Sequence, residues 1–472
     1  MLSSLPIFHR QKEVFCHMRL QTRLAIACAK LANIIIRITI HKKGGTFPGY
    51  LARLIKPDIL PALCDMVHGK IIVTMGTNGK TTVNNILYQA ISAEGKKVLS
   101  NSTGANMING ITAAFVLAAD RKGGLDIDYA CIEVDELAAL QVLPMLRPDC
   151  VLLTNIFRDQ LDRFGEVDAI LNKIKEALFT VPDARLIINC DDSLLAALAS
   201  LCPNPVITYG INEQIFDSAS RPPAPESLFC RVCGAKLDYD YFHYGQLGSY
   251  QCPCCGWQRP KPDFTAEKIV LKQQGYSFDL KGVHIDSCTD FPYNIYNILS
   301  AHTALCAENI PTERFALTMN TLDYGNHREE HFFINGSHVR LHLAKNPVGL
   351  QQKISLIQRD CAPKDIIFQI NDRLQDGTDL SWLWDVNVTY LKTSHISSIT
   401  VLGKRRHDMA LRLKYDDIPC ACAKSLKPSV WNLSLHGTGN IYIIVNYSGL
   451  LSANTLLRKL QRKSQLCSIL RV

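Results

Sequence analysis

The stretch IIVTMGTNGKTTVNNILYQ, residues 71–89, decides how this chain folds. Its β-branched run IIVTM predicts a buried strand, and the amphipathic run that follows predicts a helix. Seven residues suited to phosphate binding lie at the junction: Gly76, Thr77, Asn78, Gly79, Lys80, Thr81 and Thr82. Backbone N–H groups in such a loop can point at phosphate oxygens, and Lys80 can reach the terminal phosphates. We therefore predict a nucleotide site in which Thr81 holds a metal ion, and favour it over a plain glycine turn.

Strand and helix patterns alternate on both sides of this loop. Aliphatic runs of strand length recur between residues 70 and 215 and again from Val339 onward, separated by amphipathic runs such as residues 167–181. This alternation predicts an α/β fold with a mainly parallel sheet, whose ligands collect at the carboxyl ends of the strands. Between the two regions we expect a linking stretch that contains one helix, residues 294–310.

Composition limits the architecture and the partners. With 472 residues, of which 47% are apolar, the chain can form two or three packed domains. The net charge of +8 is small for this length, and the most distinctive aromatic segment carries little positive charge. We therefore expect no nucleic-acid partner.

Residues 1–48 are expected to form an N-terminal leader followed by a helix, with Met18 as an alternative start. They lack the apolar core and cleavage site of a secretory signal. The apolar stretch 24–40 is interrupted by Lys30 and Arg37 and is shorter than the roughly 20 residues that a membrane span needs. We favour a helix packed on the protein over one lying on a membrane. The eighteen cysteines without a secretion signal predict a cytoplasmic protein.

Acidic side chains follow three predicted strands. They are Glu133, Asp135 and Glu136 in IEVDE, Asp159 and Asp162 in FRDQLD, and Asp191 and Asp192 in NCDD. Each group alone is more often a solvated turn. Together, at the strand ends of one sheet, they favour a site that holds magnesium on a nucleotide.

Two Cys-x-x-C turns lie about twenty residues apart, in CRVCG and CPCCG. This is the spacing of a zinc ribbon, in which each turn supplies two thiolates to a tetrahedral ion. The predicted ligands are Cys230, Cys233, Cys252 and Cys255, with Cys254 as a spare. Proline-rich flanks indicate a small module inserted at about residues 225–262, to which we assign a structural role.

The motifs GTNGKTT, GAN (residues 104–106), IEVDE, TNIFRDQLDRFGE and NCDD occur in the order found in Mur ligases. From about residue 50 to its end the chain resembles this family, and most of all its MurT-type branch, which carries a cysteine-rich insertion. The resemblance implies a central ATP-binding domain, residues 49–330, and a C-terminal Rossmann-like α/β domain, residues 331–472. It adds Asn155, Asn189 and Asp191 to the expected ATP-binding residues. It also implies that Thr81 and Glu133 bind magnesium, and that Lys80 is catalytic.

The segment DGTDLSWLWD, residues 376–385, has two interpretations of equal weight. From the residues alone it is a turn at Asp376 and Gly377 before a helix capped by Thr378 or Asp379, with Trp382 and Trp384 in the core. The resemblance implies instead that Asp379 completes a Cys-His-Asp glutaminase triad, with the Cys and His on a GatD-type glutamine amidotransferase partner in a heterodimer. A carboxylate can orient such an imidazole across a subunit boundary.

Other matches to the family are weaker. Lys345 and Asn346 in LAKNPVG are candidate nucleotide or substrate contacts, and Gly403 and Arg405 match a glycine–arginine stretch. The chain departs from the family pattern at Phe291, which stands where a glycine usually precedes the Asn294/Asn297 pair, and at GNHR, residues 325–328. Gln160 replaces a metal-binding histidine of many Mur ligases, as it does in the MurT-type branch.

The resemblance implies a peptidoglycan enzyme. The expected reaction is ATP-dependent amidation of the α-carboxylate of D-glutamate in the lipid II stem peptide, through an acyl phosphate and with ammonia from the glutaminase partner. Its cofactors are ATP, magnesium and a structural zinc, and transient association with the inner face of the plasma membrane stays open. The alternatives are an amino-acid-adding Mur or folylpolyglutamate-type ligase without a glutaminase, and a nucleotide-binding regulatory module whose ribbon reads nucleic acid.

Overall fold

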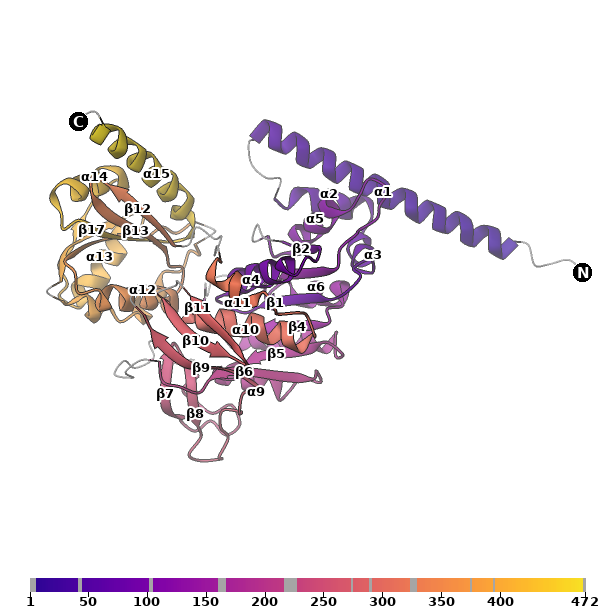
Figure 1. Cartoon of the computed structure of the whole chain (residues 1–472), viewed down its shortest axis with the longest axis horizontal. Helices are drawn as coiled ribbons and strands as arrows, with labels where there is room; N and C mark the ends of the chain where they lie inside the picture. The colour runs from indigo at the N-terminus through magenta and orange to yellow at the C-terminus, as the bar shows by residue number, and fades with distance from the viewer. Residues whose placement is uncertain are drawn as a thin grey trace, which may run out of the picture.

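The computed structural model describes residues 6–40, 45–101, 105–159, 167–215, 227–272, 275–287, 291–322, 329–373, 376–393 and 395–469. Two large β-sheets, each covered by helices, form the body of the molecule, and a long N-terminal helix runs along its outer edge (Figure 1). The expected α/β fold with parallel-rich sheets is confirmed.

The first sheet has nine strands in the order β11-β10-β9-β6-β5-β4-β1-β3-β2. Neighbours from β2 to β9 are parallel, whereas β9, β10 and β11 are antiparallel. The bounds are β1 (Ile71–Met75), β2 (Val98–Ser100), β3 (Tyr129–Glu133), β4 (Cys150–Leu153), β5 (Arg185–Asn189), β6 (Val206–Ile211), β9 (Phe264–Leu271), β10 (Tyr276–Leu280) and β11 (Val283–Ser287). The prediction of a linking stretch with one helix is therefore wrong in part, because β9, β10 and β11 lie in that stretch and extend the first sheet. Strands β9 and β11 expose many side chains, and β10 is buried but carries Ser277 and Asp279, so none of the three has the continuous apolar run of a central strand.

Helices cover both faces of this sheet. Successive strand side chains point to opposite faces, so Ile71 and Val73 join one core and Ile72 joins the other. The first core lies under α3 (Ile59–Cys64), α5 (Ile108–Ala118), α6 (Ala139–Leu146), α8 (Val167–Phe179) and α9 (Ser193–Ala199). The second lies under α4 (Lys80–Ala93), α10 (Tyr293–Ala307) and α11 (Phe315–Asn320).

The N-terminal helix α1 (Pro6–Ile40) packs on α2 (Phe47–Ile55) and α5 through one face, where Ala25, Ile26 and Ala29 are buried. Lys30, which interrupts the apolar run in the sequence, donates a hydrogen bond to the carbonyl of Ala119. Within the part of the chain that the structure describes, no helix combines the length and the apolarity needed to cross a membrane.

The cysteine-rich segment forms a small antiparallel hairpin, β7 (Asp238–Tyr244) and β8 (Leu247–Gln251), between β6 and β9 in the chain. Its own core contains Leu237 and Tyr250. The hairpin lies at the lower edge of Figure 1, beside β9 and α9.

The second sheet has six strands in the order β12-β13-β17-β14-β15-β16, all parallel except β12. Its strands are β12 (Glu329–Ile334), β13 (Ser337–Leu343), β14 (Lys364–Gln369), β15 (Ile396–Leu402), β16 (Ala421–Cys422) and β17 (Asn440–Val445). Its helices are α12 (Pro347–Arg359), the 3-10 turns η1 (Ser381–Asp385) and η2 (Val388–Leu391), α13 (Arg406–Tyr415), α14 (Leu426–His436) and α15 (Tyr447–Ile469).

Candidate nucleotide and metal sites

The predicted phosphate loop lies at the carboxyl end of β1 and opens α4, as its sequence context requires. Gly76 and Gly79 adopt φ angles of +120° and +89°, a region that side chains other than glycine rarely enter. A Cβ atom on Gly79 would lie 2.4 Å from the Asn297 Oδ1, and one on Gly76 would lie 2.3 Å from the Thr154 Oγ1. At Gly76 the backbone oxygen and nitrogen of Asn155 lie at 2.8 and 3.0 Å from the same position, so space as well as conformation requires glycine, whereas at Gly79 the close atoms belong to the Asn297 side chain and conformation is the stronger requirement.

Residues that follow β4 hold this loop in place. The Asn78 N–H donates to the Asn155 Oδ1 at 2.9 Å, and the Asn78 carbonyl accepts from the Asn155 Nδ2 at 3.1 Å and the Thr154 Oγ1 at 2.7 Å. The Thr77 N–H donates to the Asn155 carbonyl at 2.8 Å. Asn155 thus fixes the shape of the loop from the side of the adjacent strand.

Lys80 lies among carboxylates at the start of α4. Its Nζ donates to the Glu136 Oε1 at 2.9 Å and to the Gly76 carbonyl at 2.5 Å. The Glu136 Oε1 also accepts from the Gly76 N–H at 2.8 Å. Burial opposes the charge on Lys80, but Glu136, Glu133 and Asp135 outweigh it and raise the lysine pKa above its ordinary value. Lys80 therefore carries its positive charge at neutral pH, ready to face an anionic group.

Glu133 ends β3 beside this loop and is 3% exposed. Its Oε1 accepts from the Asn106 Nδ2 at 3.0 Å, whereas the Oε2 is buried and accepts no hydrogen bond from any described residue. A buried carboxylate oxygen without a donor is costly unless a cation or water completes it. Oxygen is the ligand that magnesium prefers, so this Glu133 oxygen is of the kind that a magnesium ion binds.

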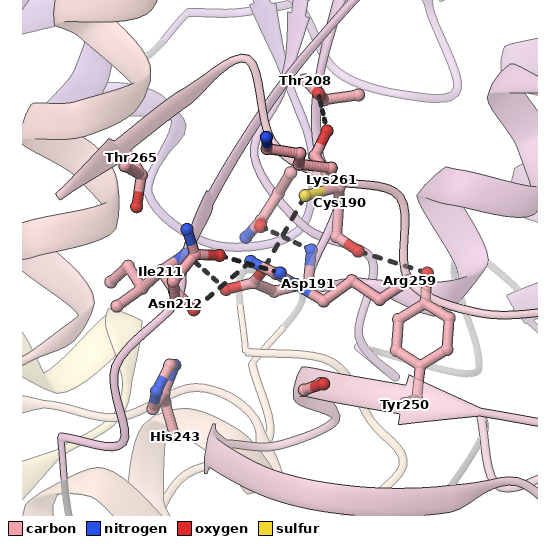
Figure 2. A network of polar contacts seen from close by, with 12 residues as sticks. Cys190, Asp191, Thr208, Ile211, Asn212, His243, Tyr250, Arg259, Lys261 and Thr265 are labelled. Carbon is pink, nitrogen blue, oxygen red and sulfur yellow. Dashed lines mark hydrogen bonds and ion pairs between the residues drawn. The ribbon is translucent and has the colours of Figure 1, made fainter.

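Asp191 lies after β5 and is fully buried in a network of polar contacts (Figure 2). The Arg259 Nε donates to its Oδ1 at 2.7 Å, and the Ile211 N–H and the Tyr296 hydroxyl donate to its Oδ2 at 2.9 Å and 2.5 Å. Both oxygens therefore serve the fold, tying the exit of the cysteine-rich segment to the sheet. Asn189, two residues earlier, keeps a buried Nδ2 without an acceptor among the described residues.

The tip of the β7–β8 hairpin reaches the loop that follows β4. The Gln246 Nε2 donates to the Ile156 carbonyl at 2.5 Å, and the Ile156 N–H donates to the Asp192 Oδ2 at 2.8 Å. A Cβ atom on Gly245 would lie 2.6 Å from the Phe157 ring, so the hairpin turn packs directly on this loop. The hairpin therefore contacts the loop after β4, and Asn155 in that loop contacts the phosphate loop.

The four predicted zinc ligands come together at the other end of the hairpin. Their ligand atoms all lie within 4.8 Å of one another, with Sγ–Sγ distances of 3.6 Å between Cys230 and Cys255 and 3.5 Å between Cys233 and Cys252. A tetrahedral zinc with Zn–S bonds of about 2.3 Å separates its sulfurs by about 3.8 Å, so the four thiols fit this ion. The Cys255 N–H donates a hydrogen bond to the Cys252 Sγ at 3.5 Å. Cys254 is exposed and lies outside this group.

The second sheet region contributes side chains to the phosphate loop. Asn346 caps α12 by accepting from the Gly349 N–H at 2.8 Å, and its Nδ2 donates to the Asn78 Oδ1 at 3.0 Å. The Lys345 Nζ donates to the Asp159 Oδ2 at 2.6 Å. The Asp159 Oδ1 is buried without a donor among the described residues. The two weaker candidates, Lys345 and Asn346, thus lie where both sheet regions meet the loop.

Asp379 lies before η1 and is half-buried. Its Oδ1 accepts from the Ser381 N–H at 2.9 Å and its Oδ2 from the Ser381 hydroxyl at 2.8 Å, which fixes the carboxylate near the surface. Trp382 is buried as expected. The placement of Trp384 in the core was wrong, because it is 48% exposed, and its ring meets the edge of Tyr415, at 5.1 Å between centroids, and the Arg412 guanidinium, 5.4 Å from the ring centroid. The segment forms a 3-10 turn, and this tighter helix moves Trp384 off the buried face.

Several other predicted positions have structural roles or lie outside the described residues. Phe291 is buried and stacked on Tyr293, and the Lys353 Nζ lies 3.3 Å from its ring centroid, so the residue that replaces the usual glycine is a packing element. The Arg405 Nε lies 3.3 Å from the Asp372 Oδ2. The calls on Gly104, Gln160, Asp162 and residues 325–328 lie outside the described residues.

Sequence reasoning missed two groups that shape the site. Glu136 was one acid among three, and nothing in IEVDE distinguishes it as the partner of Lys80. Gln246 carries no local signal, because its contact with Ile156 joins positions 90 residues apart. Contacts of this kind appear only when the chain is folded.

Comparisons with known proteins place this geometry in a family. The chain matches the Mur ligase middle domain over residues 73–231 and the MurT ligase C-terminal family over residues 343–450. Among solved structures, the fold resembles a pseudomurein peptide ligase type C from Methanothermus fervidus, with a TM-score of 0.65, 18% identity, and coverage of 84% of this chain and 80% of that one. It also resembles MurF from Acinetobacter baumannii, with a TM-score of 0.63, 15% identity, and coverage of 87% and 81%.

Two curated relatives are similar over most of their length. The lipid II isoglutaminyl synthase (glutamine-hydrolyzing) subunit MurT of Staphylococcus aureus strain COL is 32% identical over 84% of this chain and 88% of its own. The subunit of the same name from Streptococcus pneumoniae strain R6 is 30% identical over 94% of this chain and 99% of its own. Since both relatives are at least 30% identical over most of both chains, the chain belongs to the MurT family of Mur ligases, which are ATP-dependent ligases.

Proposed function

We propose that this chain is the ligase subunit of a lipid II isoglutaminyl synthase, which converts the α-carboxylate of D-glutamate in the lipid II stem peptide to the amide of D-isoglutamine. The observation that carries the proposal is the near full-length similarity to two relatives that bear this name. The geometry supports the proposal, because the phosphate loop contains the charged Lys80 and a buried oxygen of Glu133 lies beside it.

The proposed chemistry uses ATP to activate the carboxylate. A carboxylate oxygen attacks the γ-phosphorus of ATP, and the bond between that phosphorus and the β-phosphate oxygen breaks. ADP departs, and the substrate carboxylate has become an acyl phosphate. Ammonia then attacks the acyl carbon, loses a proton and displaces inorganic phosphate, which leaves the amide. Fixed positive charge at Lys80 stabilises the charge that develops on the transferring phosphoryl group.

The roles follow from position. ATP is held by the loop and its neighbours, namely Gly76, Thr77, Asn78, Gly79, Lys80, Thr81, Thr82, Asn155, Asn189 and Asp191. Asp191 would act by holding the sheet end in shape, because both of its oxygens already accept internal hydrogen bonds. Thr81 and Glu133 would hold magnesium, which screens phosphate charge. Cys230, Cys233, Cys252 and Cys255 would hold a structural zinc.

Asp379 is proposed to serve a partner subunit. Its carboxylate is half-buried and oriented by Ser381, so it can accept a hydrogen bond from the imidazole of a GatD-type glutamine amidotransferase in a heterodimer. That partner would supply ammonia from glutamine. The relatives are named as subunits of a glutamine-hydrolysing enzyme, which supports the need for one.

The proposed organisation keeps three parts. Residues 1–48 form an N-terminal extension, residues 49–330 an ATP-binding domain with the ribbon at about 225–262, and residues 331–472 a C-terminal domain. A lipid-linked substrate places the enzyme in the cytoplasm at the inner face of the plasma membrane.

Amidation of lipid II by this chain mixed with a GatD-type glutaminase tests the proposal. The wild type and Asp379→Asn are compared with glutamine and with free ammonia as the nitrogen source. Asp408→Asn, another partly exposed aspartate of the C-terminal region, is the matched control. We expect the wild type and the control to use both sources, and Asp379→Asn to use ammonia alone, with glutamine-dependent activity reduced by a factor on the order of 10⁴.

Two results would contradict the proposal. Addition of an amino acid in place of ammonia by the wild type would assign the chain to the peptide-forming Mur ligases. Equal loss of glutamine- and ammonia-dependent activity in Asp379→Asn would show that Asp379 serves the ligase reaction itself and would remove the shared triad.

A further inference from the structure

One face of α1 packs on the rest of the protein, so the opposite face points away from it. Ala25, Ile26 and Ala29 are buried against α2 and α5. The Arg23 Nε donates to the Lys122 carbonyl at 2.9 Å, and Lys30 donates to the Ala119 carbonyl. The helix therefore cannot rotate about its axis to hide its other side.

The opposite face is apolar and exposed. Leu20, Leu24, Leu31, Ile35 and Ile38 are 65%, 54%, 59%, 51% and 68% exposed. At about 100° per residue these five positions fall within about 60° of one another around the helix. Such a continuous apolar stripe on the surface of a soluble domain marks a contact surface more often than a chance exposure.

The neighbouring helix α2 also exposes apolar side chains. Phe47, Tyr50 and Leu54 are 48%, 51% and 67% exposed. Phe47 and Tyr50 lie with their ring centroids 6.3 Å apart. Tyr50, with an apolar ring and a hydroxyl group, is of the type favoured at the boundary between water and lipid.

Positive charge is concentrated on the same segment. Residues 10–43 contain eight lysines and arginines and a single acidic residue, Glu13, so they supply seven of the eight net positive charges of the chain. Arg23, Lys30 and Arg37 recur every seven residues and therefore lie along one flank of the helix. The remaining 438 residues are close to neutral.

An apolar stripe beside a basic flank is the pattern of a helix that lies in the plane of an anionic membrane surface. The helix does not combine the length and apolarity of a span. Figure 1 shows α1 along the outer edge of the molecule, with its N-terminal part extending past the other elements, so a flat surface could approach it. We propose that the stripe of Leu20, Leu24, Leu31, Ile35 and Ile38 docks the protein on an anionic lipid bilayer.

The proposed docking surface rests on the exposed apolar side chains and the positive charge of α1, and it does not depend on the proposed function. Its consequence for catalysis rests on the proposed function, because only a lipid-linked substrate gains from an enzyme held at the bilayer. Docking would then raise the rate on lipid II in vesicles and leave the rate on a water-soluble stem-peptide analogue unchanged.

Co-sedimentation of the full chain with vesicles tests the surface. Phosphatidylcholine vesicles with phosphatidylglycerol are compared with phosphatidylcholine alone, at low and at high salt. The variant combines Leu24→Gln, Leu31→Gln and Ile38→Gln. The control combines Leu411→Gln, Leu435→Gln and Leu451→Gln, which removes three exposed leucines from other helices. We expect wild type and control to bind the anionic vesicles, and the variant to bind at least about tenfold more weakly.

Two outcomes would overturn the proposal: wild type that stays in solution with anionic vesicles, or a variant that binds them as well as wild type. A wild type that is dimeric by light scattering, with a monomeric variant and no vesicle binding, would assign the stripe to a second copy of the chain. Amidation of a water-soluble analogue, measured in parallel, separates the two proposals. Vesicle binding without amidation would remove the proposed function only, and amidation without vesicle binding would remove the docking surface only.

Discussion

Gly79 shows how one residue joins backbone conformation to nucleotide binding. It stands at φ +89° where the phosphate loop enters α4, and a Cβ atom there would meet the Asn297 Oδ1 at 2.4 Å. Asn297 lies on α10, so the contact also sets how closely α10 approaches the loop. The positive φ favours glycine, and the Asn297 side chain would have to shift to admit a methyl group.

Gly79→Ala is expected to weaken ATP binding by more than about tenfold, because the added methyl group must displace Asn297 or reshape the loop. The matched control is Gly95→Ala, which stands at φ +77° just after the same helix with nothing within 4 Å of its Cβ position. The control should lower stability by about 1 kcal/mol and leave ATP affinity unchanged. Titration calorimetry with ATP measures both variants. Equal affinities would show that the loop tolerates the clash.

Local residue patterns predicted the parts of the site that are close in sequence. The phosphate loop and the two Cys-x-x-C turns each depend on spacings of a few residues, which the backbone translates directly into geometry. The exposure of Trp384 could not be predicted, since it depends on whether ten residues form an α-helix or a 3-10 turn. The internal partners of Asp191 come from β6, α10 and the last part of the ribbon insertion, and no local pattern records them.

At the scale of elements, the β7–β8 hairpin connects two sites. Its base carries the four clustered cysteines, and its tip places Gln246 on the loop after β4. That loop holds Asn155 against the phosphate loop. The central parallel strands were predictable because their buried residues are mostly apolar, whereas β9, β10 and β11 were not, because polar residues interrupt each of them.

Gln246→Ala is expected to loosen the loop after β4, because the substitution leaves the buried Ile156 carbonyl without its donor. A buried unsatisfied group costs about 1–3 kcal/mol, so amide hydrogen exchange in residues 155–159 should become roughly 5- to 150-fold faster. Gln251→Ala, at an exposed glutamine of β8, is the control and should leave this exchange unchanged.

Chelation of the metal proposed at the four cysteines should change exchange in residues 155–159 in the same direction as Gln246→Ala, because the hairpin loses its fixed base. Unchanged exchange in residues 155–159 under both treatments would show that the hairpin and the loop are independent. The exchange measurement needs no substrate and is therefore separate from activity.

At the scale of the whole molecule, the two sheet regions meet around the phosphate loop through polar contacts. Asn346 reaches Asn78, Lys345 reaches Asp159, and the Arg158 Nη1 donates to the Asp385 Oδ2 at 3.0 Å. The last pair joins the loop after β4 to η1, the turn that begins two residues after Asp379. The proposed nucleotide site and the proposed partner-facing carboxylate are thus linked through one ion pair and one short 3-10 turn.

A charge exchange at this pair tests whether the contact matters for ATP binding. The side chains of Arg158 and Asp385 are 28% and 22% exposed, so the pair is partly shielded from water. Arg158→Glu and Asp385→Arg should each weaken ATP binding, because each places like charges together where the two regions meet. The double variant should recover affinity, with a coupling energy of about 0.5–3 kcal/mol. The control exchanges Arg147 and Asp65, an ion pair of 2.7 Å with both side chains about 60% exposed, where surface screening makes the expected coupling below about 1 kcal/mol. If the Arg158/Asp385 double variant binds ATP no better than the weaker single variant, the contact is incidental and the two regions are held at the loop by Lys345 and Asn346 instead.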